Sequence, residues 1–182
     1  MIQKICKMLV LGYGNVDRRD DGVALHVVNA LRERLGQPPI DPHETDGLEA
    51  RGGELDTGFV HQLTPELAEI AAAYDRVVFV DTHLGHYDEL IRQVPVPAEA
   101  RPTIVSHQLS PGTVLALARE LYGGHPAGVL ISIRGHDFDF GTQLSPDTAA
   151  GVEPAVARIW ALYRPDQHVQ PLVSAYPKGE DG

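Results

Sequence analysis

The stretch Arg76-Val-Val-Phe-Val-Asp81 decides the fold class. Its uninterrupted apolar run is typical of a strand that is buried on both faces, as the strands of parallel sheets are. The run ends directly in an acid, Asp81. Because ligands of open α/β sheets bind beyond the carboxyl ends of the strands, this position makes Asp81 a candidate functional residue.

The N-terminal part of the chain repeats the pattern of an apolar run followed by acids. Residues Ile5–Leu11 predict a second buried strand, which leads into the turn Gly12-Tyr13-Gly14-Asn15. A helix is expected next, because apolar residues recur at helical spacing: Val23, Ala24, Val27, Val28 and Leu31. Asp20 or Asp21 can cap this helix, since acids suit the positive end of a helix.

Strands and helices alternate through the rest of the chain. Apolar runs predict strands at residues 53–60, 90–96 and 129–133. The second of these is expected at a sheet edge, because Pro95 and Pro97 limit its pairing. A hydroxyl residue followed by proline opens each of three predicted helices: Thr64-Pro65, Ser110-Pro111 and Ser145-Pro146.

This alternation predicts an α/β fold. We expect a three-layer sandwich in which a mostly parallel twisted sheet is flanked by helices on both faces. The chain has 182 residues, which fits one domain over residues 1–164 and a flexible, polar tail over residues 165–182. Residues Gly36–Gly53 combine prolines, glycines and acids without a sustained period, and predict a long exposed loop.

Composition narrows the classes of partner. The chain has 25 acidic and 15 basic residues, and the formal net charge of -10 argues against nucleic acid. No apolar run approaches the roughly 20 residues that span a bilayer, so no membrane partner is expected. The single cysteine, Cys6, fits a reducing, cytoplasmic location, and its apolar surroundings predict a small core residue. We expect a monomer.

Asp21, Asp81 and His107 form the candidate site. A parallel sheet places Asp21 and Asp81 at one edge, and His107 precedes a predicted helix start. Two carboxylates and an imidazole suit a divalent transition metal with open coordination positions, and paired carboxylates can also divide acid and base duties. Purely structural interpretations remain: a helix cap, an acceptor for backbone donors and a loop histidine. His83 and His86 are alternative or auxiliary ligands.

Other catalytic classes have less support. Gly12-Tyr13-Gly14 invites a dinucleotide-binding interpretation, but Asp17 stands where that fingerprint needs its third glycine, and an acid there would repel a pyrophosphate. The sequence has no serine nucleophile elbow and no His-Glu-x-x-His motif. A nucleotide-binding α/β enzyme is therefore a remote alternative.

Four segments resemble the nickel-iron hydrogenase maturation endopeptidases. Val10-Leu11-Gly12-Tyr13-Gly14-Asn15, followed by Asp20-Asp21-Gly22-Val23-Ala24, resembles the family's glycine-asparagine turn and acidic pair. Residues Val77–Asp81 resemble the strand that carries its second acid, and Ser106–Ser110 resembles the segment that carries its histidine. Gly141–Pro146 resembles the approach to its last helix. The four matches fall in order along most of the chain.

The resemblance implies an endopeptidase that removes the C-terminal extension of a nickel-iron hydrogenase large-subunit precursor after nickel insertion. Asp21, Asp81 and His107 are the implied metal-recognising and catalytic residues. The implied nickel belongs to the precursor and is not a permanent cofactor. For the chemical step, either a carboxylate acts as general base toward water, or the metal polarises the carbonyl or activates water.

Two segments depart from the family pattern. Leu55–Gln62 keeps only part of the glycine-threonine-rich loop expected after the second strand, and the Gly36–Gly53 loop is longer than typical. Both departures bear on substrate contacts and specificity. The first also motivates an alternative function, a non-cleaving nickel-binding maturation chaperone of the same fold.

Overall fold

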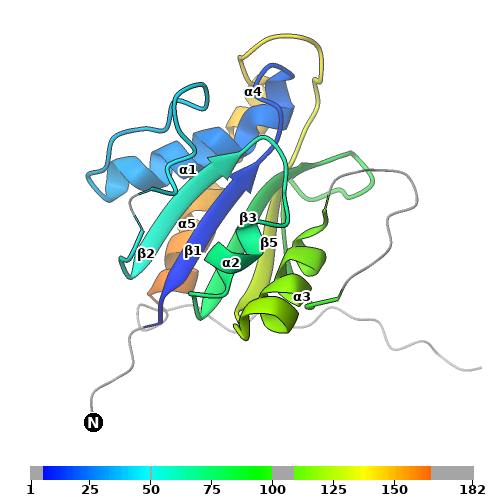
Figure 1. Cartoon of the computed structure of the whole chain (residues 1–182). Helices are drawn as coiled ribbons and strands as arrows, with labels where there is room; N and C mark the ends of the chain where they lie inside the picture. The colour runs from blue at the N-terminus through cyan, green and yellow to red at the C-terminus, as the bar shows by residue number, and fades with distance from the viewer. Residues whose placement is uncertain (1–5, 50, 100–108, 165–182) are drawn as a thin grey trace, which may run out of the picture.

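The computed structural model describes residues 6–49, 51–99 and 109–164. Within these ranges, strands form one sheet in the order β2-β1-β3-β5-β4 (Figure 1). The strands are β1 (Met8–Tyr13), β2 (Leu55–Val60), β3 (Arg76–His83), β4 (Ile91–Val96) and β5 (Ala127–Arg134). The helices are the 3-10 helix η1 (Arg19–Gly22) and the α-helices α1 (Val23–Arg34), α2 (Leu67–Ala71), α3 (Pro111–Tyr122), α4 (Pro146–Ala149) and α5 (Val152–Tyr163).

The sheet is parallel except at one edge. β1 pairs in parallel with β2 and β3, and β3 pairs in parallel with β5. β4 pairs antiparallel with β5 at the edge, where Pro95 is tolerated because an edge residue need not donate to a neighbouring strand. Helices cover both faces (Figure 1). The predicted α/β sandwich with a mostly parallel sheet is therefore confirmed.

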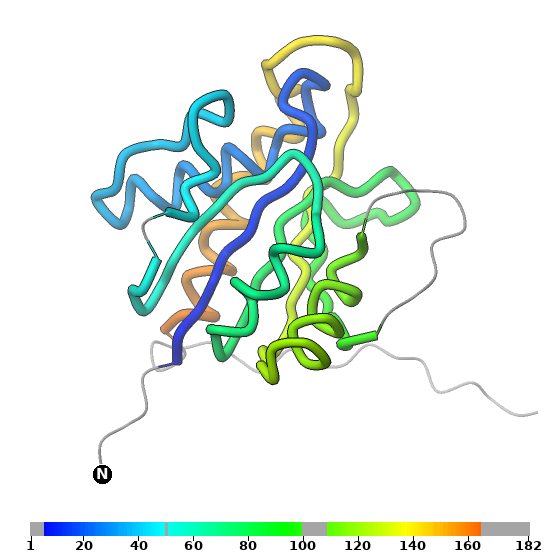
Figure 2. The backbone as a smooth tube through the Cα atoms, viewed as in Figure 1, coloured from blue at the N-terminus to red at the C-terminus, as the bar shows by residue number. Residues whose placement is uncertain are grey.

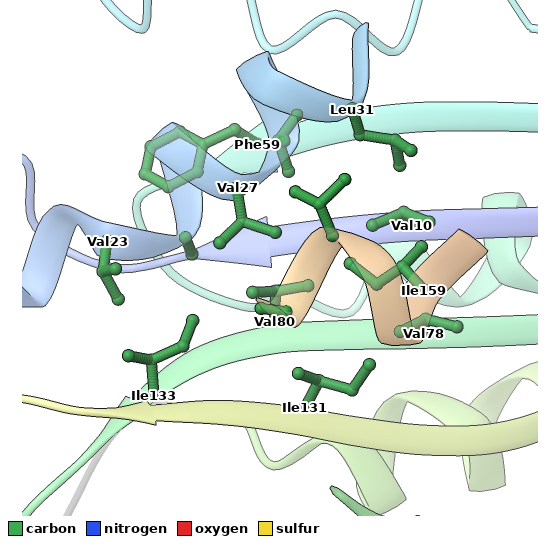
Figure 3. Close-up of a cluster of buried hydrophobic side chains, with 14 of the residues drawn as sticks. Val10, Val23, Val27, Leu31, Phe59, Val78, Val80, Ile131, Ile133 and Ile159 are labelled. Atoms are coloured by element: carbon green, nitrogen blue, oxygen red, sulfur yellow. The ribbon is translucent and has the colours of Figure 1, made fainter. Parts of the chain in front are cut away.

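Successive residues of the central strands point to opposite faces, and both faces are buried. Val78 belongs to a core cluster with α1 and α5, whereas its neighbour Phe79 belongs to a second cluster with α2 and α3. Figure 3 shows the first cluster, in which Val27 of α1 and Ile159 of α5 lie over the sheet. Burial on both faces explains the uninterrupted apolar run at residues 77–80.

The strand order places a switch point between β1 and β3. The chain leaves β1 through α1 toward β2 on one side, whereas β3 lies on the other side, and α1 and α2 cover opposite faces. At such a point a crevice opens outside the carboxyl ends of the strands. The segments after β1 and β5 meet at this end (Figure 2), where the Arg19 N–H donates to the Gly141 carbonyl at 2.8 Å.

Most described residues of the Gly36–Gly53 loop are exposed, as predicted, but two apolar residues anchor it in the core. Ile40 packs into the α1–α5 core and Leu48 into the α2–α3 core, so the loop contributes to both faces of the sheet. The Phe59 N–H of β2 donates to the Asp46 carbonyl at 2.9 Å. A Cβ atom at Gly58 would lie 2.4 Å from the Leu48 side chain, so this glycine makes room for the loop.

Some local predictions are confirmed and others are wrong. Cys6 is exposed rather than buried, because β1 begins only at Met8. Thr64 does not cap α2, which begins three residues later after a turn. Ser110 and Ser145 do act as N-caps, since their hydroxyls accept hydrogen bonds from backbone N–H groups of α3 and α4.

The described part of the chain ends one residue after α5. The predicted tail at residues 165–182 lies outside it, and the domain boundary at residue 164 stays a prediction. Within the described ranges, no helix combines the length and the apolar character needed to cross a membrane.

Candidate active site

Asp21 lies in η1, directly after the turn that ends β1. Its Oδ2 atom accepts a hydrogen bond from the Asn15 N–H at 2.9 Å. Gly14 permits this close approach, because it has a φ of +148° and a Cβ atom there would lie 2.1 Å from the Asp21 carbonyl oxygen. The glycine-asparagine turn thus holds the Asp21 carboxylate at the carboxyl edge of the sheet.

Asp81 lies in the carboxyl-terminal half of β3, beside the end of β1. Gly12 of β1 pairs with Val80 of β3, so Tyr13 and Asp81 are neighbours on adjacent strands. Both side chains lie on the α2–α3 face, because they continue the alternation that places Leu11 and Phe79 in that core. The Asp81 Oδ1 atom accepts a hydrogen bond from the Thr82 N–H at 2.7 Å.

The charge of Asp21 acts on the Asp81 carboxyl. Burial and the nearby charge of Asp21 raise the pKa of Asp81 to about 6, although a hydrogen bond from the Tyr13 hydroxyl opposes the rise. Burial and the charges of Asp81 and Asp21 raise the pKa of Tyr13, so its hydroxyl stays protonated and donates. The structure therefore brings Asp21 and Asp81 together, and it adds Tyr13 to the site.

Asp20 has a different role from its neighbour, and neither acid caps α1, whose N-cap residue Gly22 makes no side-chain cap hydrogen bond. The buried Asp20 carboxylate accepts hydrogen bonds of 2.7–2.8 Å from three backbone N–H groups and two hydroxyls. Burial alone raises its pKa, but these bonds outweigh burial and lower it. The donors belong to His136, Asp137, Ser145 and Thr148.

The Asp20 bonds fix the segment after β5 against the segment that carries Asp21. A second set of backbone bonds joins the same two segments, since the Gly141 N–H donates to the Asp17 carbonyl at 3.0 Å. The Thr82 hydroxyl donates to the Asp20 carbonyl at 2.9 Å and ties β3 to η1. Asp20 thereby helps to hold the two candidate acids in place.

His107 lies outside the described residues, so its position relative to the two acids stays a prediction. α3 begins beside the end of β4, since a Cβ atom at Gly112 would lie 2.8 Å from the Pro97 carbonyl oxygen. Within the described ranges, no group of three His, Cys, Asp or Glu residues could hold a metal ion.

The auxiliary histidines make other contacts. The Nδ1 atom of His83 lies 2.9 Å from the Ser132 hydroxyl, and its Nε2 atom lies 3.1 Å from the Glu89 carbonyl oxygen. Both ring nitrogens of His83 thus have hydrogen-bond partners. His86 is exposed in the loop between β3 and β4. Neither histidine belongs to a three-residue ligand group within the described part of the chain.

The altered Asp56-Thr57-Gly58 stretch lies inside β2, away from the carboxyl edge. The buried Asp56 carboxylate accepts a hydrogen bond from the Tyr74 hydroxyl at 2.8 Å, and Thr57 accepts one from Arg32 at 2.9 Å. These side chains stabilise β2 and its neighbouring loop. Asp56, Thr57 and Gly58 therefore take no part in the edge that carries Asp21 and Asp81.

Sequence reasoning missed Tyr13 and Asp20. Tyr13 had a usable signal, because it continues the alternation of Leu9 and Leu11 toward one face of the sheet. No local sequence pattern indicated the role of Asp20, because its hydrogen-bond partners are 116 to 128 residues away along the chain.

The fold and the site define a class: an open α/β sheet with two interacting carboxylates at its switch point. This is the fold of solved hydrogenase maturation endopeptidases. The hydrogenase maturating endopeptidase HybD from E. coli matches with a TM-score of 0.67 at 22% identity, covering 88% of this chain and 94% of that chain.

Two archaeal structures have the same fold. The [NiFe] hydrogenase maturation protease HycI from Thermococcus kodakarensis KOD1 matches with a TM-score of 0.61 at 20% identity, covering 87% of this chain and 93% of that chain. HybD from Thermococcus kodakarensis matches with a TM-score of 0.59 at 19% identity, covering 87% and 99%. No protein-family model and no curated protein sequence matches the chain.

Proposed function

We propose that this protein is an endopeptidase that removes the C-terminal extension of a nickel-iron hydrogenase large-subunit precursor after nickel insertion. The observation that carries the proposal is the placement of Asp21, after β1, and of Asp81, near the end of the adjacent parallel strand β3, at the switch point of the sheet. The fold shared with the named maturation proteases supports it. The motifs around both acids resemble that family as well.

In this proposal the nickel arrives with the precursor, and the protein's own residues recognise it. Asp21 and Asp81 supply carboxylate oxygens, and His107 supplies an imidazole nitrogen. Two carboxylates that repel each other in a partly buried site suit a divalent cation, because the cation relieves both the repulsion and the cost of burial. Such a small set of protein ligands leaves coordination positions for the precursor's own ligands.

The chemical step is hydrolysis of the peptide bond that the bound metal brings to the edge of the sheet. A carboxylate there can accept a proton from the attacking water. Tyr13 holds the Asp81 carboxyl through its hydroxyl, and the Thr82 N–H holds one of the Asp81 oxygens. These contacts orient Asp81 before the precursor binds.

The test is cleavage of purified precursor, with and without nickel, followed by intact-mass measurement. We expect the wild-type protein to shorten only the nickel-loaded precursor, and Asp21→Ala, Asp81→Ala and His107→Ala each to lose most of the activity. Glu33→Ala, on the exposed side of α1, serves as the control. Full conversion by all three variants would refute the site. An unshortened precursor with wild-type protein would instead favour the non-cleaving chaperone.

A further inference from the structure

A groove of about 550 Å³ opens at the carboxyl end of β2, next to the candidate site. Its floor consists of the buried side chains of Leu48, Phe59 and Leu67. One wall comes from residues 42–48 of the long α1–β2 loop, and the opposite wall comes from the turn between β2 and α2. The long loop and the turn thus line one cavity.

The groove is continuous with the edge that carries the two acids. Val16 and Asp17 line it, and they directly follow Asn15, whose N–H binds the Asp21 carboxylate. Val60 also lines it, and Val60 pairs with Tyr13 in the sheet. Along the carboxyl edge, the order is therefore Asp81, Tyr13, Val60 and then the groove.

The spacing of the strands sets how far a bound peptide must reach. Asp81 and Val60 lie two strands apart, a separation of about 10 Å across parallel strands. An extended chain covers this distance in about three residues. A peptide whose bond lies at Asp81 can therefore place a side chain about three positions away into the groove.

The lining of the groove indicates the chemistry of that side chain. The floor is apolar, whereas the rim carries the carboxylates of Asp17, Asp46 and Glu66. Among the described residues that line the groove there is no lysine and no arginine. An apolar floor below an acidic rim favours a peptide with an apolar residue next to a basic one.

We propose that this groove is the subsite that binds the precursor about three residues from the cleaved bond, holding an apolar side chain on its floor and a basic one at its rim. The proposal rests on the proposed endopeptidase function. In this proposal, the wall formed by residues 42–48 of the α1–β2 loop selects the substrate. That wall is fixed by the Phe59 N–H, which donates to the Asp46 carbonyl, and by Leu48, which packs over Gly58.

Peptide binding tests the groove independently of cleavage. The isotope-labelled full chain is titrated with three capped hexapeptides that place Leu-Lys, Leu-Glu or Ala-Lys between glycines, while backbone amide shifts are recorded. We expect the Leu-Lys peptide to shift the amides of His43, Asp46 and His61 and to bind more tightly than the other two. Equal binding of all three peptides, or shifts confined to another surface, would overturn the proposal.

Charge-neutral variants test the rim. Asp46→Asn/Glu66→Gln removes two charges, and the new Asn keeps the oxygen that accepts the Leu48 N–H at 2.8 Å. We expect this double variant to bind the Leu-Lys peptide about fivefold more weakly, given the usual strength of exposed ion pairs. Glu33→Gln/Glu153→Gln, on α1 and α5, removes the same charge from a distant surface and should bind as wild type does.

Kinetics with the nickel-loaded precursor separate this proposal from the proposed function. A subsite away from the reacting atoms should raise KM for Asp46→Asn/Glu66→Gln by about fivefold and leave kcat within about twofold. Cleavage with an unchanged KM would overturn the groove while the endopeptidase function stands. Absence of any cleavage by wild-type protein would overturn the function, whatever the hexapeptides show.

Discussion

The Tyr13 hydroxyl hydrogen-bonds the Asp81 carboxyl across two adjacent parallel strands. Tyr13 is the last residue of β1, and Asp81 lies in the part of β3 that extends beyond the pairing with β1. The bond lowers the pKa of Asp81, whereas burial and Asp21 raise it. A phenol that stays protonated is thus placed where it favours the ionised form of a partly buried acid.

Tyr13→Phe should weaken the site without unfolding the protein. The variant removes one hydroxyl, so the pKa of Asp81 should rise above about 6. Cleavage of nickel-loaded precursor near pH 6 should fall several-fold, and the loss should shrink at higher pH as Asp81 ionises. Carboxyl-carbon NMR of the metal-free protein measures the pKa of Asp81 directly.

Tyr74→Phe is the matched control for Tyr13→Phe. It also removes a hydroxyl that donates to a buried acid, Asp56. This acid lies in β2, away from the carboxyl edge. We expect a loss of stability of about 1 kcal/mol in this variant and an unchanged pKa of Asp81. A pKa of Asp81 that is the same in Tyr13→Phe as in wild type would disprove the positioning role of Tyr13.

Asp81→Asn should stabilise the protein at neutral pH while it removes activity. The folded protein raises the pKa of Asp81 from 3.8 to about 6, so it binds this proton more tightly than the unfolded chain does. Ionisation therefore costs stability as the pH rises from about 4 to about 6, by at most about 3 kcal/mol. The amide avoids this loss.

Urea unfolding of wild type and Asp81→Asn at pH 4 and at pH 7.5 checks the sign. The gain from the substitution should be small at pH 4 and reach its full size at pH 7.5. Asp88→Asn, in the exposed β3–β4 loop, should show no such pH-dependent gain. A destabilised Asp81→Asn at pH 7.5 would mean that the ionised carboxylate is favoured by the fold, contrary to the expected direction.

Asp20→Ala should be among the most destabilising single substitutions in the chain. It leaves buried and partly buried donors of the segment after β5 without their acceptor, which costs roughly 3 kcal/mol or more. The folded protein lowers the pKa of Asp20, so its contribution is present above the ordinary carboxyl pKa and is lost as the pH falls below it.

Hydrogen exchange of the His136 and Ser145 amides reports this effect locally. Both amides donate to Asp20 and should exchange faster in Asp20→Ala, together with a loss of cleavage, because Asp21 is no longer held in place. Asp139→Ala, an exposed acid of the same segment, should leave both amides protected. Unchanged protection in Asp20→Ala would show that other contacts hold the segment.

The layers of the fold could be predicted because they depend on local patterns. The apolar run at residues 77–80 indicates a strand buried on both faces, and Ser110-Pro111 indicates a helix start, whatever the rest of the chain does. The common edge of Asp21 and Asp81 follows from the parallel pairing of β1 and β3, which an alternation of strands and helices favours.

The remaining features depend on contacts between distant segments. The contact between Tyr13 and Asp81 depends on the register of β1 against β3, and the role of Asp20 depends on a segment more than 100 residues away. The two buried anchors of the Gly36–Gly53 loop, Ile40 and Leu48, were not predicted because each is isolated among residues that are not apolar. Such single anchors leave no periodic signal in a sequence.

Gly14→Ala should disrupt the site through the backbone. The new Cβ atom would lie 2.1 Å from the Asp21 carbonyl oxygen, and Gly14 has a φ of +148° that side chains rarely adopt, so the turn must move away from Asp21. We expect a loss of stability of roughly 3 kcal/mol or more and loss of precursor cleavage.

Gly36→Ala is the control, because its φ of +67° is also positive but no atom lies within 4 Å of the new Cβ. It should lose only about 1 kcal/mol and keep full activity, as measured by urea unfolding and the intact-mass cleavage assay. Equal losses in the two variants would show that backbone strain alone, rather than contact with Asp21, explains the glycine at position 14.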